Sequence, residues 1–173
     1  RLRMSELQNW YVNEGYSLTR VSGPNRVTPQ GLVQLKVSQG KVSGIEVQFL
    51  NAEGDSTNEK GESIKGKTRQ WVIKREISIK PGEIFNRNQL ERDIKRLYGT
   101  SLFSDIKVSL KPVAGEPGTV NILLGIVEQS TGSLSGGVGF SQAQGVFGQA
   151  GLQESNLFGR AWNAGLNLTY GQF

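Results

Sequence analysis

Apolar and polar side chains alternate most clearly near the C-terminal end of the chain. From Trp162 to Gly171, every second residue is apolar and the residues between are Asn, Gly or Thr. Successive side chains of a β-strand point to opposite faces, so this pattern predicts a strand with one apolar and one small polar face. At about 3.3 Å per residue, Trp162 and Tyr170 lie roughly 26 Å apart, close to the height of the apolar band of a membrane β-barrel. Residues 134–142 show the same period more weakly.

Charged side chains are almost absent from residues 132–173. This segment holds one of the 20 Lys and Arg residues, Arg160, and one of the 15 Asp and Glu residues, Glu154. About a quarter of the residues of an average soluble protein are charged. We therefore interpret residues 132–173 as the first strands of a membrane β-barrel. A half-solvated strand of a soluble protein has the same period and is the alternative. The net charge of +5, which is 20 minus 15, belongs to the rest of the chain.

A polar, glycine-containing loop, Asn51–Gly66, follows an alternating strand over residues 45–50. A loop of about this length without predicted structure is unusual inside a compact domain, and such loops are often functional or disordered. Two interpretations stay open, a gating or docking loop and a mobile insertion. The candidate residues are Asn51, Glu53, Asp55, Glu59 and Lys65.

Two helices and two strands are expected after this loop. Thr68 can cap the first helix, which would run to about Ile79. For the second helix, Asn86 and Gln89 form a capping-box pattern and Gly99 suits the C′ position. Its apolar stripe is Leu90, Ile94, Leu97 and Tyr98, and the strands that follow cover residues 106–111 and 120–127.

The order strand, helix, helix, strand, strand occurs in part a second time. Leu7, Tyr11 and Gly15 correspond to Leu90, Ile94 and Gly99, and the apolar positions of residues 33–37 correspond to those of residues 120–124. Repetition of this kind predicts an array of similar modules. Residues 1–40 would be the second half of one module, and residues 41–130 a complete one.

Enzymatic and metal chemistry find little support in the composition. The chain has no Cys and no His, which removes thiol and imidazole catalysis and almost every zinc site. Glu91 and Asp93 are interpreted as solubilising charges that interrupt a basic helix face. We expect no catalytic residue, no cofactor and no metal. Nucleic acid is not an expected partner, because no recognised nucleic-acid-binding motif appears.

These patterns resemble a known family. The strand-helix-helix-strand-strand module resembles a POTRA (polypeptide-transport-associated) domain. Residues 131–140, Thr-Gly-Ser-Leu-Ser-Gly-Gly-Val-Gly-Phe, resemble the entry into the barrel of BamA-type outer-membrane pores. The stretch Asn156–Arg160, Asn-Leu-Phe-Gly-Arg, is similar to the family's segment between early barrel strands, with Ala161 where a Gly is usual. The sequence looks most like cyanobacterial members and members from the chloroplast outer envelope.

The resemblance implies an α+β fold. POTRA repeats, each a three-stranded sheet with two helices on one face, would precede the first strands of an antiparallel transmembrane β-barrel. Residues 1–40 would be the C-terminal half of a POTRA domain, residues 41–130 the last complete POTRA domain, and residues 131–173 the start of the barrel. Because the chain opens directly on what looks like a helix and ends within a barrel, we expect it to be part of a longer protein.

The function that the resemblance implies is that of a non-enzymatic pore. It would insert or translocate polypeptides at the outer membrane, with the POTRA domains in the periplasm, or at the outer envelope membrane of a plastid. Expected partners are unfolded outer-membrane or transported polypeptides, membrane lipids around the barrel, and accessory assembly proteins. The alternative is a soluble periplasmic POTRA-type module that docks peptides or proteins.

Two strands are candidate sites in this interpretation. The first is the edge strand of the POTRA sheet, which would pair with extended clients through backbone bonds. It comprises Asp105, Ile106, Lys107, Val108, Ser109, Leu110 and Lys111, in which the lysines would prevent self-association or attract acidic clients. The second is the first barrel strand, expected to form a weak seam because Gly and Ser make few cross-strand contacts. It comprises Leu134, Gly136, Gly137, Val138, Gly139 and Phe140.

Overall fold

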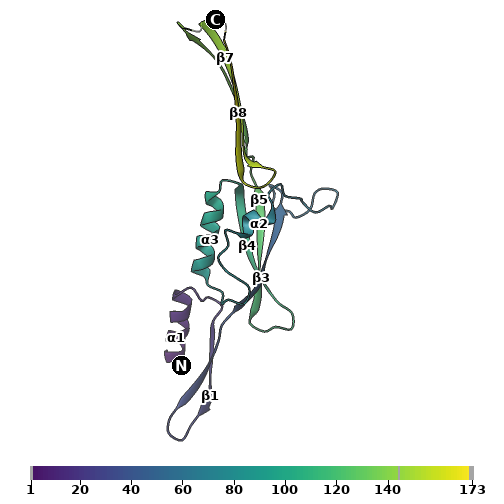
Figure 1. The fold of residues 1–173 in the computed structure, drawn as a ribbon. Helices are drawn as coiled ribbons and strands as arrows, with labels where there is room; N and C mark the ends of the chain where they lie inside the picture. The colour runs from purple at the N-terminus through teal and green to yellow at the C-terminus, as the bar shows by residue number, and fades with distance from the viewer. Residues whose placement is uncertain (1, 144, 172–173) are drawn as a thin grey trace.

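A computed structural model describes residues 2–143 and 145–171 of the chain. Within these ranges the strands form three separate sheets, and the sheets follow one another along a single long axis (Figure 1). The N-terminal helix lies toward one end of this axis and the last strand toward the other. No helix in the two described ranges is long and apolar enough to cross a membrane.

The N-terminal unit contains α1 (Leu2–Asn13) and an antiparallel hairpin of β1 (Arg20–Val27) and β2 (Val33–Ser38). Gly15 follows α1 with a φ of +97°, and its carbonyl accepts a 2.8 Å hydrogen bond from the Arg87 amide. A methyl group at Gly15 would lie 2.5 Å from Oδ1 of Asn86. Glycine is therefore required where the N-terminal unit contacts the next one.

The central unit, residues 41–129, contains a mixed three-stranded sheet and two helices. Its elements are β3 (Lys41–Leu50), α2 (Gln70–Lys74), α3 (Arg87–Gly99), β4 (Phe103–Pro112) and β5 (Thr119–Glu128). β5 lies in the middle of the sheet, parallel to β3 and antiparallel to β4. This α+β arrangement agrees with the module that the sequence predicts.

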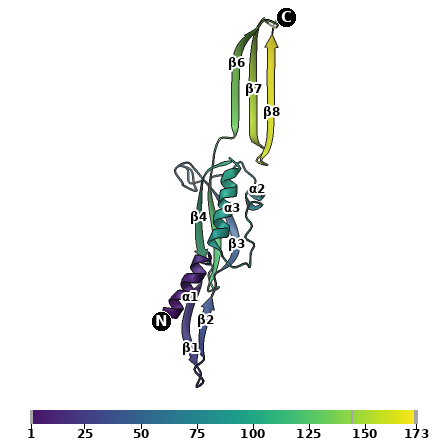
Figure 2. The ribbon, with the colours of Figure 1, turned by 90° about the vertical axis from the view of Figure 1, so that its left-hand side faces the viewer.

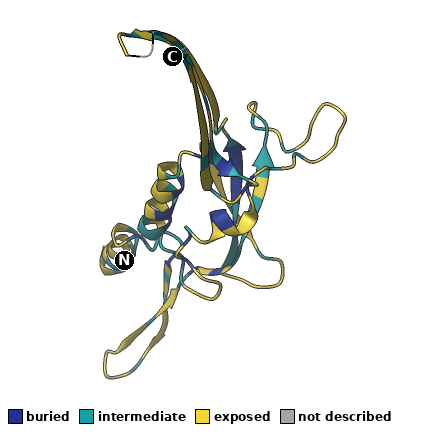
Figure 3. Ribbon diagram, turned by 45° about the horizontal axis from the view of Figure 1, so that its top comes forward, coloured by how far each residue is buried: buried dark blue, intermediate teal, exposed yellow. Residues whose placement is uncertain are grey.

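One hydrophobic core holds the central unit together (Figure 3). Ile122, Leu124 and Ile126 of β5 are completely buried, and their spacing of two residues places them on one face of the sheet. Both helices contribute to the same core, so both cover this face. The helical residues involved are Val72 and Ile73 of α2 and Leu90 and Leu97 of α3.

The first helix is shorter than the sequence predicts. α2 ends at Lys74 and does not continue to Ile79. Beyond the helix, Ile77 and Ile79 are buried while Ser78 between them is exposed, which is the period of an extended segment. Thr68 is not the cap, because Arg69 takes the N-cap position.

The second helix confirms one predicted cap and corrects two others. The Asn86 side chain accepts hydrogen bonds from the amides of Asn88 and Gln89, as expected of an N-cap. The Gln89 side chain does not complete a capping box; it donates to the Ser78 hydroxyl at 3.0 Å. Gly99 lies inside α3 and Thr100 is the C-cap, so the predicted C′ position is wrong.

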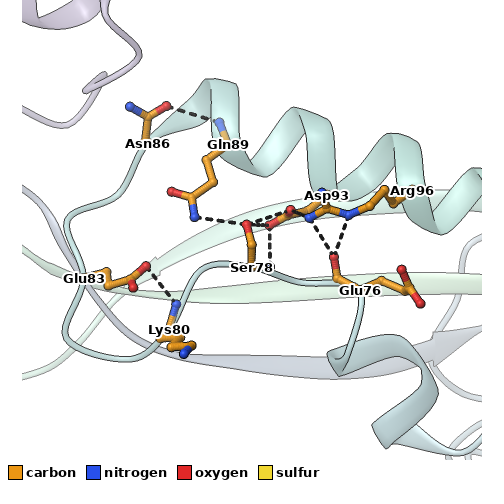
Figure 4. A network of polar contacts seen from close by, with 8 residues as sticks. All are labelled: Glu76, Ser78, Lys80, Glu83, Asn86, Gln89, Asp93 and Arg96. Atoms are coloured by element: carbon orange, nitrogen blue, oxygen red, sulfur yellow. Dashed lines mark hydrogen bonds and ion pairs between the residues drawn. The ribbon is translucent and has the colours of Figure 1, made fainter.

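Asp93 is not a solubilising charge, because it is completely buried. Its carboxylate accepts hydrogen bonds from the Ser78 amide at 2.9 Å and from the Ser78 hydroxyl, and it pairs with the Arg96 guanidinium (Figure 4). Arg96 also donates to the Glu76 carbonyl at 3.2 Å. A buried carboxylate is tolerated only when such partners replace water. The network fastens α3 to the extended segment after α2.

The last sheet stands beyond the central unit (Figure 2). It consists of β6 (Gly132–Ser141), β7 (Gly145–Leu157) and β8 (Trp162–Gly171), antiparallel and in that order. The strand predicted over residues 162–171 is therefore present. Leu134, Leu152 and Leu166 are in register across the sheet and share one face. The exposed apolar side chains of that face are Leu134, Val138, Phe140, Val146, Leu152, Leu166, Leu168 and Tyr170.

Candidate functional site

β4 forms one edge of the central sheet and contains all seven residues of the predicted edge strand. Its inner side pairs with β5 from Phe103 to Pro112. The Ile106 amide does not join this ladder; it donates to the Tyr98 hydroxyl at 2.9 Å and to the Asp105 carboxylate at 2.9 Å. Because backbone groups alternate in direction along a strand, the amides of Val108 and Leu110 point outward as well. The open part of the edge is therefore at Val108 and Leu110.

An apolar groove of about 540 Å³ runs beside this edge, between β4 and α3. We call it the β4–α3 groove. Its apolar lining residues are Phe85, Leu90, Ile94, Tyr98, Val108 and Leu110. Arg87, Glu91 and Lys95 complete the lining from α3. A free strand edge and an apolar groove thus lie side by side, which the sequence did not predict.

The two lysines of β4 point away from the groove. Side chains alternate along the strand, so Lys107 and Lys111 lie on the face opposite Val108 and Leu110. A methyl group at Gly54 would lie 2.4 Å from Nζ of Lys107, so this lysine reaches across to the loop after β3. Lys111 is exposed. Neither lysine closes the groove.

The Asn51–Gly66 loop is ordered by its own hydrogen bonds, which corrects the expectation that it has no structure. Oδ1 of Asn51 accepts from the Asp55 amide at 2.7 Å, and Oδ1 of Asn58 accepts from two amides of the next turn. Thr57 and Ser63 form a bridge between the two arms. The loop projects from the end of the central unit that faces the last sheet (Figure 1). The candidate residues Glu53, Asp55, Glu59 and Lys65 are exposed, and Asn51 is half-buried.

β6 contains the residues of the predicted seam strand and forms one edge of the last sheet. Leu134 and Val138 are 82% and 83% exposed and lie on the apolar face. On the other face, a methyl group at Gly139 would lie 2.5 Å from the Phe147 ring, so the ring covers this glycine. Gly136 and Gly137 meet only atoms of β7 at ordinary contact distances. β6 therefore makes few cross-strand packing contacts.

The end of β7 and the turn that leads to β8, residues 156–161, contact the segment that precedes α2. Nδ2 of Asn156 donates a 2.9 Å hydrogen bond to the Thr68 hydroxyl, and the Arg69 amide donates to the Gly159 carbonyl at 2.8 Å. Asn156 and Thr68 are 2% and 3% exposed. At the margin, Lys67 forms an ion pair of 2.9 Å with Glu154. We call this set of contacts the turn joint.

Sequence reasoning did not identify the residues of the turn joint as a site. In the sequence, Asn156–Arg160 stands out only through its family resemblance, and the pattern around Thr68 predicts a helix cap. No local pattern relates these positions, because the contact joins residues that are 88 positions apart. The three positive φ angles at Phe158, Gly159 and Ala161 are visible only in the structure.

Comparisons with known proteins agree with this architecture. Residues 60–129 match the family model POTRA, surface antigen variable number repeat. Outer envelope protein 80 of rice chloroplasts is 28% identical over 98% of this chain and 25% of its own length. POTRA1-3 of the periplasmic domain of Omp85 from Anabaena has a TM-score of 0.68 at 42% identity, over 73% of this chain and 49% of that one. These matches show that the chain is similar to members of the Omp85 superfamily and contains a POTRA domain.

A further solved structure resembles almost the whole of this chain. BamA from Haemophilus ducreyi, crystallised without POTRA domains 1-3, has a TM-score of 0.56 at 21% identity, over 99% of this chain and 31% of that one. At this identity the likeness is one of fold, and its coverage includes the last sheet.

The comparisons confirm the predicted superfamily, its POTRA fold and its location at an outer membrane or outer envelope. The chain spans about a quarter of the length of the rice relative, 25%. The roles of β4, the Asn51–Gly66 loop and β6 stay predictions.

Proposed function

We propose that this chain is a member of the Omp85 superfamily and part of a non-enzymatic outer-membrane pore that inserts or translocates polypeptides. We further propose that unfolded clients bind first at β4. The observation that carries this proposal is the open edge at Val108 and Leu110 beside the β4–α3 groove. An extended segment can add to such an edge through backbone bonds alone, so binding does not require one particular sequence.

The groove adds a preference to this general binding. A client strand paired with β4 would place every second side chain on the groove side. There it would contact Leu90, Ile94 and Tyr98, all of which line the groove. Segments with an apolar residue at every second position would therefore bind more tightly than segments of the same composition in another order. Strands destined for a membrane barrel have this alternation.

Replacement of one outward amide tests the edge. Proline at an edge position whose amide faces solvent leaves the inner ladder intact. Val108→Pro is expected to weaken binding of a fluorescent alternating Leu/Thr peptide about 2- to 10-fold, because one hydrogen bond contributes roughly 0.5–1.5 kcal/mol. Val108→Thr, which keeps the amide, is the matched control. Equal affinity of both variants in an anisotropy titration would contradict binding at this edge.

We propose that the β6–β8 sheet is the lipid-facing start of the pore wall. Its two faces support this assignment, since one carries the exposed apolar side chains and the other carries a polar hollow of about 420 Å³. The hollow is lined by Ser135, Gln149, Asn167 and Thr169, among others. An uncovered apolar face is stable in lipid and unstable in water. Bilayer lipids are the partners expected on this face.

Protease protection in lipid vesicles tests the membrane assignment. In the complete pore, cleavage confined to residues 1–130, with residues 132–171 protected, is the expected result. Equal cleavage of both segments would exclude a membrane boundary at Gly132 and favour the alternative, a soluble periplasmic POTRA-type docking module. Accessory assembly proteins stay predicted partners.

β6 is proposed as the strand at which clients enter the wall. It is an edge of its sheet and makes few cross-strand packing contacts. Separating β6 from a strand paired with its outer edge therefore requires little free energy. A disulfide between Cys placed at Gly137 and Cys placed in the last strand of the complete pore should block client insertion. Normal insertion with the crosslink fully formed would contradict the proposal.

The Asn51–Gly66 loop is proposed as a gating or docking element of the pore mouth. Its position at the end of the central unit that faces the last sheet supports this role, and its internal hydrogen bonds give it a defined shape (Figure 1). Deletion of residues 53–65 in the complete pore should change channel conductance. Unchanged conductance and transport would leave it a surface insertion.

A further inference from the structure

The chain passes only once between the central unit and the β6–β8 sheet, through residues 129–131. One covalent connection by itself leaves a neighbouring unit free to swing, because each residue has two soft backbone dihedrals. The Gln129 amide donates to the Leu102 carbonyl at 3.1 Å, and the Ser155 amide donates to the Thr131 carbonyl at 3.1 Å. These bonds order the connection, but they lie on one side of the sheet's base.

The turn joint supplies a second point of attachment. Its two central bonds run from Asn156 to Thr68 and from Arg69 to Gly159. Asn156, Thr68 and Gly159 are buried at this contact, whereas Arg69 is exposed. Two separated attachments remove the rotation that a single connection permits. Breaking the Asn156–Thr68 pair would leave a buried amide without a partner, which typically costs about 1–3 kcal/mol.

The central unit holds its half of the joint in place with Glu128. This carboxylate accepts hydrogen bonds from the Lys67 amide at 2.8 Å and from the Thr68 amide at 2.6 Å. Glu128 is the last residue of β5, the strand that leads into β6. Both attachments of the last sheet are therefore anchored at the same end of the same central strand.

The opposite half of the joint admits no side chain at its centre. A methyl group at Gly159 would lie 1.9 Å from the Lys67 carbonyl oxygen. Gly159 has a φ of +69°, and Phe158 before it and Ala161 two residues after it are also left-handed, at +54° and +56°. Left-handed non-glycine residues persist where surrounding contacts impose them. The Asn156 side chain imposes one of them directly, because its Oδ1 accepts from the Ala161 amide at 2.9 Å.

The orientation that results brings two strand edges to one side of the molecule. Figure 2 shows β4 and β6 toward the same side, with α2 and β8 toward the other. A polar hollow of about 480 Å³ lies between the turn that begins β4 and the base of β6. It is lined by Ser101, Gln129, Thr131 and Ser133, among others. The Gln129 side chain donates to the Ser101 carbonyl, and the Thr131 hydroxyl donates to the Glu154 carboxylate. The lining between the two edges is therefore polar and partly paired within itself.

From this geometry we infer that the turn joint is a lock that sets the β6–β8 sheet at one angle on the POTRA unit, so that the edge of β4 leads into the edge of β6. Asn156, Gly159 and Thr68 are its positioning residues. The inference rests on the proposed function in one respect, the use of both edges by clients. The angle itself is a property of the chain and is measured separately.

Two substitutions open the lock in different ways. Gly159→Ala introduces a methyl group where the Lys67 carbonyl lies, and Thr68→Val removes the acceptor of the Asn156 amide while keeping the side-chain shape. Gly115→Ala is the matched control for the first, because Gly115 has a similar φ of +77° and nothing lies within 4 Å of its added methyl. It carries the same backbone strain without the clash.

Distances between two spin labels, measured by electron spin resonance, report the angle between the β6–β8 sheet and the central unit. The chain has no Cys, so labels at Arg92→Cys on α3 and Gln142→Cys beyond β6 report on the two units without interference in a pore free of other cysteines. The parent and Gly115→Ala should each give one narrow distance distribution. Gly159→Ala and Thr68→Val should give a broadened or shifted one. Unchanged distributions in both variants would overturn the lock.

Client handling is measured on the same variants. Peptide binding at β4 should stay unchanged, while insertion of a client into vesicles should fall about tenfold or more. The reason is that a client bound at the edge of β4 is no longer held close to the edge of β6. An altered distance with normal insertion would overturn the role of the lock in hand-over. Absence of peptide binding at β4 in the parent would overturn the proposed function, and the distance measurement would still decide whether the lock exists.

Discussion

The amide of Ala161 donates a 2.9 Å hydrogen bond to Oδ1 of Asn156 and holds Ala161 at a φ of +56°. This is the position at which the family usually has Gly, and a left-handed backbone explains that preference. A left-handed alanine costs roughly 1–2 kcal/mol, and loss of its methyl group from the edge of the core costs about 0.8 kcal/mol.

Ala161→Gly should therefore leave the stability unchanged or raise it by up to about 1 kcal/mol. Ala164→Gly is the control, because Ala164 lies in β8 and is not left-handed; it should destabilise by about 0.5–1 kcal/mol. Urea unfolding of the chain in detergent compares the two. A larger loss for Ala161→Gly than for Ala164→Gly would contradict the strain at this turn.

Asp93→Ala should destabilise the central unit by about 3 kcal/mol, because it leaves the Ser78 amide and hydroxyl and the Arg96 guanidinium without their acceptor. Glu91→Ala on the same helix is the control. Glu91 is exposed and makes only a 3.7 Å pair with Arg87, which contributes less than about 0.5 kcal/mol. Equal losses in chemical unfolding would mean that the buried network does not stabilise the fold.

Gly66→Ala should destabilise the central unit by about 1–3 kcal/mol. A methyl group at Gly66 would lie 2.2 Å from the Phe49 ring, and this ring packs against the core. Gly99→Ala is the opposite case, because its methyl group meets nothing within 4 Å inside α3. That substitution should stabilise by about 0.5–1 kcal/mol. Thermal unfolding in which both shift the midpoint the same way would refute the contrast.

The Tyr98 hydroxyl and the Asp105 carboxylate both accept hydrogen bonds from the outward amide of Ile106. Removing both, with Tyr98→Phe and Asp105→Ala, frees this amide and lengthens the open edge of β4. We expect stronger self-association of the double variant, since exposed strand edges pair with one another. Tyr98→Phe alone, in which Asp105 still accepts from the amide, should stay close to the parent. Sedimentation velocity measures the degree of self-association of each variant. Identical sedimentation of the double variant and Tyr98→Phe would show that the Ile106 amide does not control pairing at this edge.

Local patterns predicted much of the fold. The stripe from Leu90 to Leu97 forms the buried face of α3, and the alternation from Trp162 to Gly171 forms β8. These predictions held because one regular element imposes one period on its side chains. The helix expected to reach Ile79 failed because Ile77 and Ile79 are spaced for a strand. A short window that contains both spacings does not say where a helix ends.

Charge was harder to assign than periodicity. Asp93 stands among exposed charged residues in the sequence, yet it is buried because Ser78 and Arg96 surround it. Burial of a charged residue depends on the partners that replace water around it. One of the partners of Asp93 is Ser78, which lies in a separate segment, so the local sequence does not predict this burial.

The sequence by itself determined the order of the elements, the faces that their side chains share and the resemblance to the Omp85 superfamily, because periodicity and short motifs are local properties. Only the tertiary structure decided where those faces meet. It placed Thr68 against Asn156, 88 positions away, and it set the β4–α3 groove beside an open edge. Contacts of this kind depend on the path of the whole chain, since packing and hydrogen bonding act between neighbours in space and are independent of distance along the sequence.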